Sequence, residues 1–230
     1  MERDPGADYD RTAWWATIPA VAALLEHGLN LPAGVTFLVG ENGSGKSTVI
    51  EALAGAHGLN AEGGSRSARH SSRTTESPLG GLLKVVRTPG RTANAYFLRA
   101  ETTHGLYTYL ENLPGSLDHD LHERSHGEGF LELLDRKFHG YGFYLMDEPE
   151  APLSFTSTLG LLARLDALRA DDAQVIIATH SPILTALPGA TILELGAHGI
   201  RRAAWDELEI VEHWRRFLGR PDAYLRGLLG

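Results

Sequence analysis

The sequence predicts an α/β fold, in a single domain that spans residues 1–230, around a mainly parallel central sheet with flanking helices. Short apolar runs of strand length alternate with longer segments of helical apolar spacing, which is typical of parallel sheets joined by crossover helices. A glycine-rich turn separates the first strand-like run from a helix-like segment. The chain has 230 residues, 43% of them hydrophobic, and this is enough for one sizeable core.

The first elements are a helix, a strand and a second helix. Residues 13–27 carry apolar side chains at helical spacing, with Pro19 suited to a first helical turn. VTFLV, at 35–39, is a short, partly β-branched run that predicts a buried strand. The segment 46–57, which follows the glycine-rich turn, has the composition of a helix.

The middle of the chain is less regular. Residues 60–80 are poor in apolar side chains and rich in Ser, Gly and Arg, so they predict a long mobile loop. LLKVVR and NAYFL predict two strands on either side of the turn TPGR. Residues 105–137 hold Leu, Tyr and Phe at mixed spacing and predict a small helical subdomain.

The last third returns to regular alternation. FYLM, QVIIAT and TILEL predict three further strands, and LGLLARLDALRA predicts an amphipathic helix between the first two. These elements complete the predicted α/β architecture.

Composition limits the possible functions. The chain has no cysteine, which excludes disulfides, thiolate metal sites and cysteine nucleophiles. A net charge of −8 argues against a general nucleic-acid binder, although a local basic patch remains compatible with it. The longest apolar stretch near the N-terminus is too short to span a bilayer, and no basic segment of a signal peptide precedes it. We therefore expect a cytoplasmic protein without a membrane span.

The strongest motif is GENGSGKST, which matches Gly-x4-Gly-Lys-Ser between a predicted strand and a predicted helix. Its glycines allow successive backbone N–H groups to surround a β-phosphate at the start of the helix. Lys46 can reach the β- and γ-phosphates of ATP, and the Ser47 hydroxyl can ligate Mg²⁺. The predicted nucleotide-binding residues are Gly40, Asn42, Gly43, Ser44, Gly45, Lys46, Ser47 and Thr48.

An acidic pair ends the predicted strand in FYLMDEPE. A P-loop requires a carboxylate at the end of a neighbouring strand to hold magnesium through water, and Asp147 is the candidate for that role. Glu148 is placed to polarise the attacking water as a general base. We interpret Glu150 as a solvated neighbour of this pair.

His180 follows the strand run QVIIAT. The carboxyl ends of strands in an open α/β sheet face the ligand side. His180 could therefore donate a hydrogen bond to the γ-phosphate, and we count it with Glu148 as a candidate catalytic residue.

The order of these motifs resembles that of the ABC-type ATPases, and most closely the small stand-alone, SMC-like ATPases without a coiled coil. The resemblance rests on GENGSGKST, FLRAE, SHGE, DEPEA and ATHSP and covers the chain from about Trp14 onward. It implies a P-loop NTPase that hydrolyses ATP to ADP and phosphate with Mg²⁺. It also implies an ATP-dependent homodimer with a composite site, in which Ser125, Gly127 and Glu128 of one copy contact the γ-phosphate held by the other.

The signature segment SHGEGF departs from the family pattern Leu-Ser-Gly-Gly-Gln, because His126 stands where a glycine is usual and Glu128 replaces Gln. By the same resemblance, Glu101 is a candidate magnesium contact, with a solvated acid as the equal alternative. Tyr9, Trp14 or Trp15 could stack on adenine, but a tryptophan pair at a helix start is more often core.

Three other functions compete with a soluble ATPase. An ATPase subunit of an ABC transporter has the same motifs, but the altered signature and the serine-rich loop argue against it. A DNA-repair or defence-system ATPase is a second alternative, although residues 48–125 leave no room for a long coiled coil. The third is an ATP-sensing switch without turnover, against which Glu148 argues. An unknown protein partner is compatible with all of them.

Overall fold

The computed structural model describes residues 1–65, 78–86, 94–102 and 126–229. Seven strands form the main sheet in the order β3-β5-β6-β7-β2-β8-β9, and the five central ones are mutually parallel. The edge strands β3 and β9 run antiparallel to their neighbours. The strands of this sheet are β2 Gly34–Val39, β3 Gly64–Ser65, β5 Asn94–Arg99, β6 Gly142–Asp147, β7 Gln174–Thr179, β8 Thr191–Gly196 and β9 Gly199–Arg202.

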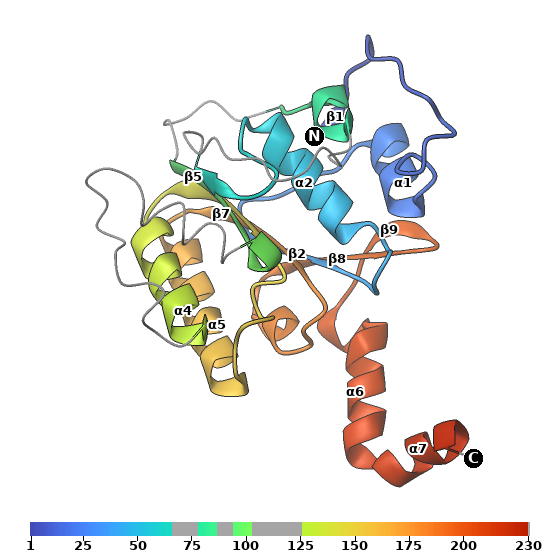
Figure 1. The fold of residues 1–230 in the computed structure, drawn as a ribbon, viewed down its shortest axis with the longest axis vertical. Coiled ribbons are helices and arrows are strands. Elements are labelled where there is room, and N and C mark those ends of the chain that lie inside the picture. The colour runs from blue at the N-terminus through green and yellow to red at the C-terminus, as the bar shows by residue number, and fades with distance from the viewer. Residues whose placement is uncertain (66–77, 87–93, 103–125, 230) are drawn as a thin grey trace.

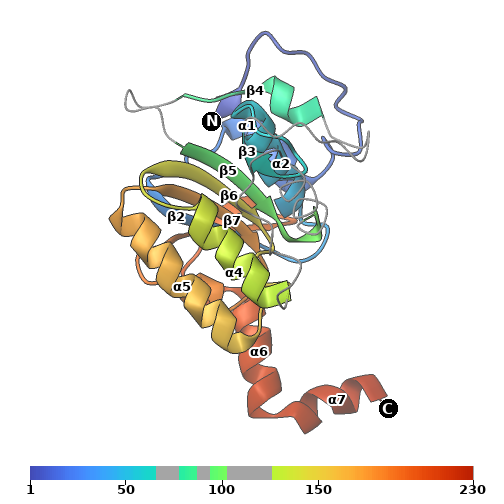
Figure 2. The same ribbon diagram turned by 60° about the vertical axis from the view of Figure 1, so that its left-hand side comes forward.

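Helices cover both faces of the sheet (Figures 1 and 2). The predicted α/β fold class is therefore confirmed. The α-helices of the described residues are α1 Pro19–His27, α2 Lys46–Ala56, α4 His126–Lys137, α5 Phe155–Ala170, α6 Glu209–Gly219 and α7 Pro221–Leu229. Short 3₁₀ turns are η1 Pro78–Leu82, η2 Ala100–Thr102, η4 Leu184–Ala186 and η5 Trp205–Glu207.

Alternation along the strands divides the core into two layers. In β2, Phe37 packs into the layer beneath α4 and α5, whereas Leu38 packs into the layer beneath α1 and α2. The same switch occurs in β6 between Tyr144 and Leu145. Each central strand is thus buried on both sides, as expected for a parallel sheet between two helical layers.

The strand order corrects one expectation. The strand that carries Asp147 is not the neighbour of the P-loop strand, because β7 lies between β6 and β2. As a result, the residues that follow β7, beginning with His180, lie between the P-loop and the acidic pair. The candidate site thus receives residues from the ends of three strands, with that of β7 in the middle.

Two predicted elements differ in the structure. LLKVVR supplies only the short strand β4, Leu83–Lys84, which pairs with β1, Glu2–Arg3, and not with β5. The helix expected at 13–27 begins only at Pro19. The predicted loop 60–80 contains β3 and the start of η1, and its residues 66–77 lie outside the described part of the chain, as does TPGR.

The sequence interpretation did not include α6 and α7, which extend away from the sheet in Figure 1. Among the residues described, no helix is both long and apolar enough to cross a membrane.

Candidate nucleotide-binding site

The glycines of the P-loop are required by close contacts. A Cβ added at Gly40 would lie 2.4 Å from the carbonyl oxygen of Leu195 in β8. Gly45, which precedes α2, has a φ of 97°, in the left-handed region, and a Cβ there would lie 2.7 Å from Cγ2 of Ile18. Only glycine, which has no Cβ, fits these close contacts and the left-handed backbone of Gly45 without strain. The loop therefore packs between Leu195 of β8 and Ile18, the N-cap residue of α1.

Lys46 is the first residue of α2 and is buried, with 4% of its surface exposed. Its Nζ donates hydrogen bonds to the carbonyl oxygens of Gly40, at 2.7 Å, and Glu41, at 3.0 Å. Burial lowers the pKa of Lys46, and the carboxylates of Glu148 and Asp147 oppose this shift. The ammonium group thus lies across the loop whose backbone would surround a phosphate.

The remaining predicted cradle residues differ in exposure. Asn42 and Gly43 are exposed at the loop tip, whereas Ser44, Ser47 and Thr48 are half-buried. The structure brings all of them to the carboxyl end of β2 and the start of α2. This is the local geometry that a P-loop requires.

Asp147 lies opposite the P-loop at the end of β6. The Ser47 hydroxyl donates a hydrogen bond to its Oδ1 at 3.3 Å, and Arg99 Nε lies 3.6 Å from its Oδ2. Burial raises the pKa of Asp147 to about 7, although Arg99 acts in the opposite direction. The structure thus joins Ser47 and Asp147, the two candidate magnesium ligands, across 100 residues of sequence.

Glu148 adopts an unusual backbone conformation, with a φ of 51°. A non-glycine residue in the left-handed region carries a cost of order 1–3 kcal/mol and is often found at functional sites. The backbone N–H of Glu148 donates to the carbonyl oxygen of Ala178 in β7 at 2.9 Å. Its Oε1 lies 3.4 Å from Nδ1 of His180, so the two predicted catalytic side chains are adjacent.

Glu150 is not a solvated neighbour, and this interpretation was wrong. It accepts hydrogen bonds from the Thr179 hydroxyl and from the backbone N–H of His180, the latter at 3.2 Å. Its other oxygen, Oε2, is buried and has no hydrogen-bond partner among the described residues. Burial raises the pKa of Glu150. Its carboxyl group therefore connects the loop after β6 to the residues that follow β7.

Arg99 was missed by the sequence interpretation. It ends β5, beside Asp147 in register, and its guanidinium contacts Glu51 Oε1 at 2.5 Å and Glu101 Oε2 at 3.4 Å. Glu101 itself is exposed. The one signal available was the FLRAE string, in which an arginine ends an apolar strand.

Some predicted residues could not be placed in full. Ser125 lies outside the described residues, and Gly127 and Glu128 belong to the first turn of α4, where only the backbone is described. The trans-acting role of these residues stays a prediction.

The three aromatic candidates for adenine stacking differ in how far they are buried. Trp15 is 5% exposed and belongs to the core beneath α1 and α2, as favoured from the sequence. Tyr9 packs against it, with ring centroids 5.7 Å apart. Trp14 is 64% exposed.

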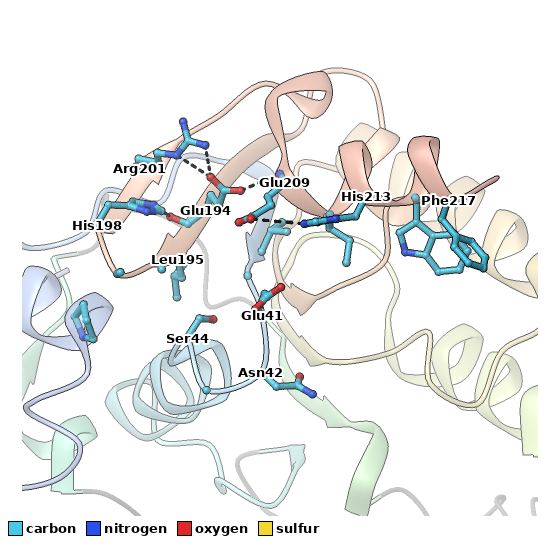
Figure 3. A pocket seen from close by; sticks show the side chains of 18 of the residues that line it. Glu41, Asn42, Ser44, Glu194, Leu195, His198, Arg201, Glu209, His213 and Phe217 are labelled. Carbon is cyan, nitrogen blue, oxygen red and sulfur yellow. Dashed lines mark hydrogen bonds and ion pairs between the residues drawn. The ribbon is translucent and has the colours of Figure 1, made fainter. Parts of the chain in front are cut away.

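A large groove of about 1170 Å³ adjoins the outer side of the P-loop. Figure 3 shows it between Glu41, Asn42 and Ser44 on one side and residues of β8 and α6 on the other. Neither Lys46 nor Asp147, Glu148 or His180 lines it. The groove thus reaches the tip of the P-loop but not the side that carries Asp147 and Glu148.

Comparison with known proteins agrees with this geometry. Residues 24–100 match the family model AAA_23, described as an AAA domain. The match covers about a third of the chain. The matched segment contains β2, the P-loop and α2 and extends just past Arg99 at the end of β5. The predicted P-loop fold, with its mainly parallel sheet and flanking helices, is thereby confirmed.

Two solved structures are similar to the chain. One is a metal-chelate type ABC transporter in an inward-facing conformation, with 15% identity and a TM-score of 0.46, covering 81% of this chain and 79% of that one. The other is the SMC head domain from Thermotoga maritima, with 17% identity and a TM-score of 0.42, covering 76% of this chain and 92% of that one. No curated protein matches the sequence.

Proposed function

We propose that the protein hydrolyses ATP to ADP and phosphate with the help of Mg²⁺. The observation that carries this proposal is the convergence of three strand ends. The P-loop lysine follows β2, the acidic pair follows β6, and His180 follows the intervening β7. Ligands bind at the carboxyl ends of strands in open α/β sheets, and these residue types are those of phosphoryl transfer to water.

The residues present fit a magnesium ion. The Ser47 hydroxyl and the Asp147 carboxylate lie 3.3 Å apart and supply the hard oxygen donors that Mg²⁺ prefers. Glu101 is a further candidate, since its carboxylate shares Arg99 with Asp147. When bound, the ion would neutralise charge that develops on the phosphate oxygens.

The chain's own groups supply the remaining steps. Lys46 would exchange its carbonyl partners for phosphate oxygens, which are stronger acceptors because they are charged. Glu148 would accept a proton from the attacking water, and its backbone adopts a left-handed conformation of the kind often found at functional sites. His180, 3.4 Å from Glu148, would orient that carboxylate or donate to the γ-phosphate.

The test is a Glu148→Gln variant with Lys46→Ala as its counterpart. Glu148→Gln should still bind Mg-ATP but release phosphate about 10²- to 10⁴-fold more slowly, which is the scale of a lost general base. Lys46→Ala should lose ATP binding while the far-UV circular dichroism spectrum stays unchanged. Undiminished phosphate release by the Glu148 variant would assign the base role to another residue.

We also propose that two copies complete the site in the presence of ATP. The resemblance of SHGEGF to an ABC-type signature supports this, and so does the exposure of the loop tip at Asn42 and Gly43, which leaves the cradle open on its outer side. A γ-phosphate held by one copy and capped by the other would favour the dimer by its differential affinity for the paired state. Hydrolysis would remove the capped group and loosen the pair.

A further inference from the structure

The guanidinium of Arg99 lies among three carboxylates from three different elements. They are Glu51 of α2, Glu101 of η2 and Asp147 of β6. The arginine side chain is 19% exposed, so these interactions are only partly screened by water. A planar guanidinium with five donors can address several carboxylates at once, which a lysine ammonium does less well.

The two oxygens of Asp147 face different groups. Oδ1 accepts from Ser47, on the P-loop side, whereas Oδ2 lies 3.6 Å from Arg99 Nε, on the β5 side. In the proposed function, magnesium approaches from the P-loop side. The arginine and the metal would therefore lie near the same carboxylate, and two cations at such distances repel each other.

We propose that Arg99 is a built-in countercharge that limits the affinity of the site for the divalent metal. In the absence of metal it offsets part of the negative charge of Asp147, which is almost fully buried. The positive charge of Arg99 also repels the metal ion, and it therefore opposes binding of the metal. The inference rests on the proposed function, because it takes Asp147 as the acid on the magnesium side.

Glu51 has the opposite effect in this arrangement. Its carboxylate lies 2.5 Å from Arg99 Nη1, so it holds the guanidinium toward α2 and offsets part of its positive charge. Loss of this carboxylate would remove one of the negative charges beside the guanidinium, while Glu101 would remain near it. A substitution at Glu51 should therefore change metal affinity in the direction opposite to a substitution at Arg99.

Binding of Mn²⁺ to the ADP-loaded protein, followed by electron paramagnetic resonance of the free ion, measures this affinity without any turnover. Arg99→Gln should bind Mn²⁺ at least about fivefold more tightly than the wild type, and Glu51→Gln should bind it at least about fivefold more weakly. Arg99→Lys keeps the charge and should stay within about twofold.

Arg136→Gln is the matched control. Arg136 has comparable exposure, 26%, and an ion pair of similar length, 2.6 Å to Glu132, on α4. Its substitution should leave Mn²⁺ affinity unchanged. Weaker or unchanged binding by Arg99→Gln would overturn the countercharge role, and so would tighter binding by Glu51→Gln. If the wild type takes up no Mn²⁺ with ADP, the proposed metal site itself fails.

Discussion

Replacement of Asp147 by Asn tests the electrostatics of the site through the stability of the metal-free protein. Asp147 is 4% exposed, and burial raises its pKa from the ordinary value of 3.8 to about 7. The opposing contributions from Arg99 and Ser47 do not cancel the cost of burial. Asn has nearly the same shape but no charge to bury.

The direction of the pH effect follows from proton binding. Between pH 3.8 and 7, the folded protein retains a proton on Asp147 that the unfolded chain releases. The stabilisation from this proton is complete below the unfolded pKa and is lost as the pH rises through the folded pKa. A pKa difference of one between the folded and unfolded states corresponds to about 1.4 kcal/mol. The rise from 3.8 to about 7 therefore corresponds to about 4 kcal/mol.

Urea unfolding in the presence of a chelator, from pH 4 to pH 8, measures this effect. The free energy of unfolding of the wild type minus that of Asp147→Asn should fall by about 4 kcal/mol across the range, and most of the fall should come before pH 7. The exposed Asp206 offers a control, because Asp206→Asn should change stability by less than about 0.5 kcal/mol throughout. A difference for Asp147→Asn that does not vary with pH would refute the reasoning.

Two further substitutions test the neighbours of the acidic pair. Glu150→Ala should destabilise the protein by about 2 kcal/mol in urea unfolding, because it removes the acceptor for Thr179 and for the backbone N–H of His180; stability equal to the wild type would show that the two hydrogen bonds contribute nothing. His180→Ala should slow phosphate release by about 10- to 100-fold at saturating ATP, because Glu148 loses its orienting neighbour. An unchanged rate would exclude His180 from the reaction.

The parts of the site that were predicted from sequence depend on local patterns. GENGSGKST fixes a strand, a turn and a helix within a few residues, and the structure places β2, the loop and α2 there. Asp147 and His180 each follow an apolar run at once, so the end of the strand locates them. The shared edge of a parallel sheet then brings them together.

The parts that were missed depend on pairings distant in sequence. Glu150 is half-buried and accepts a hydrogen bond from Thr179, 29 residues later, and Arg99 is held by Glu51, 48 residues earlier. The partner of β4 is β1, at the start of the chain, so a hairpin with NAYFL was the simpler local expectation. No short stretch of the sequence contains both members of any of these pairs.

The C-terminal helices are a different case, because their signal was present in the sequence. In EIVEHWRRFLG, Ile210, Trp214 and Phe217 recur at helical spacing, and α6 occupies Glu209–Gly219. Only Val211 of this helix is buried. The periodicity thus indicated a helix but not what its apolar side chains would contact.

The mass of the Glu148→Gln variant in solution, with and without Mg-ATP, tests the shared ATP site most directly. We expect sedimentation at the monomer mass without nucleotide and at twice that mass with Mg-ATP, because an ATP molecule that is bound but not hydrolysed would hold two copies together. Adding Ser125→Arg should abolish the doubling while ATP binding through Lys46 persists. A monomer in Mg-ATP at saturating concentration, or a Ser125→Arg variant that pairs as well as its parent, would contradict a site completed by a second copy.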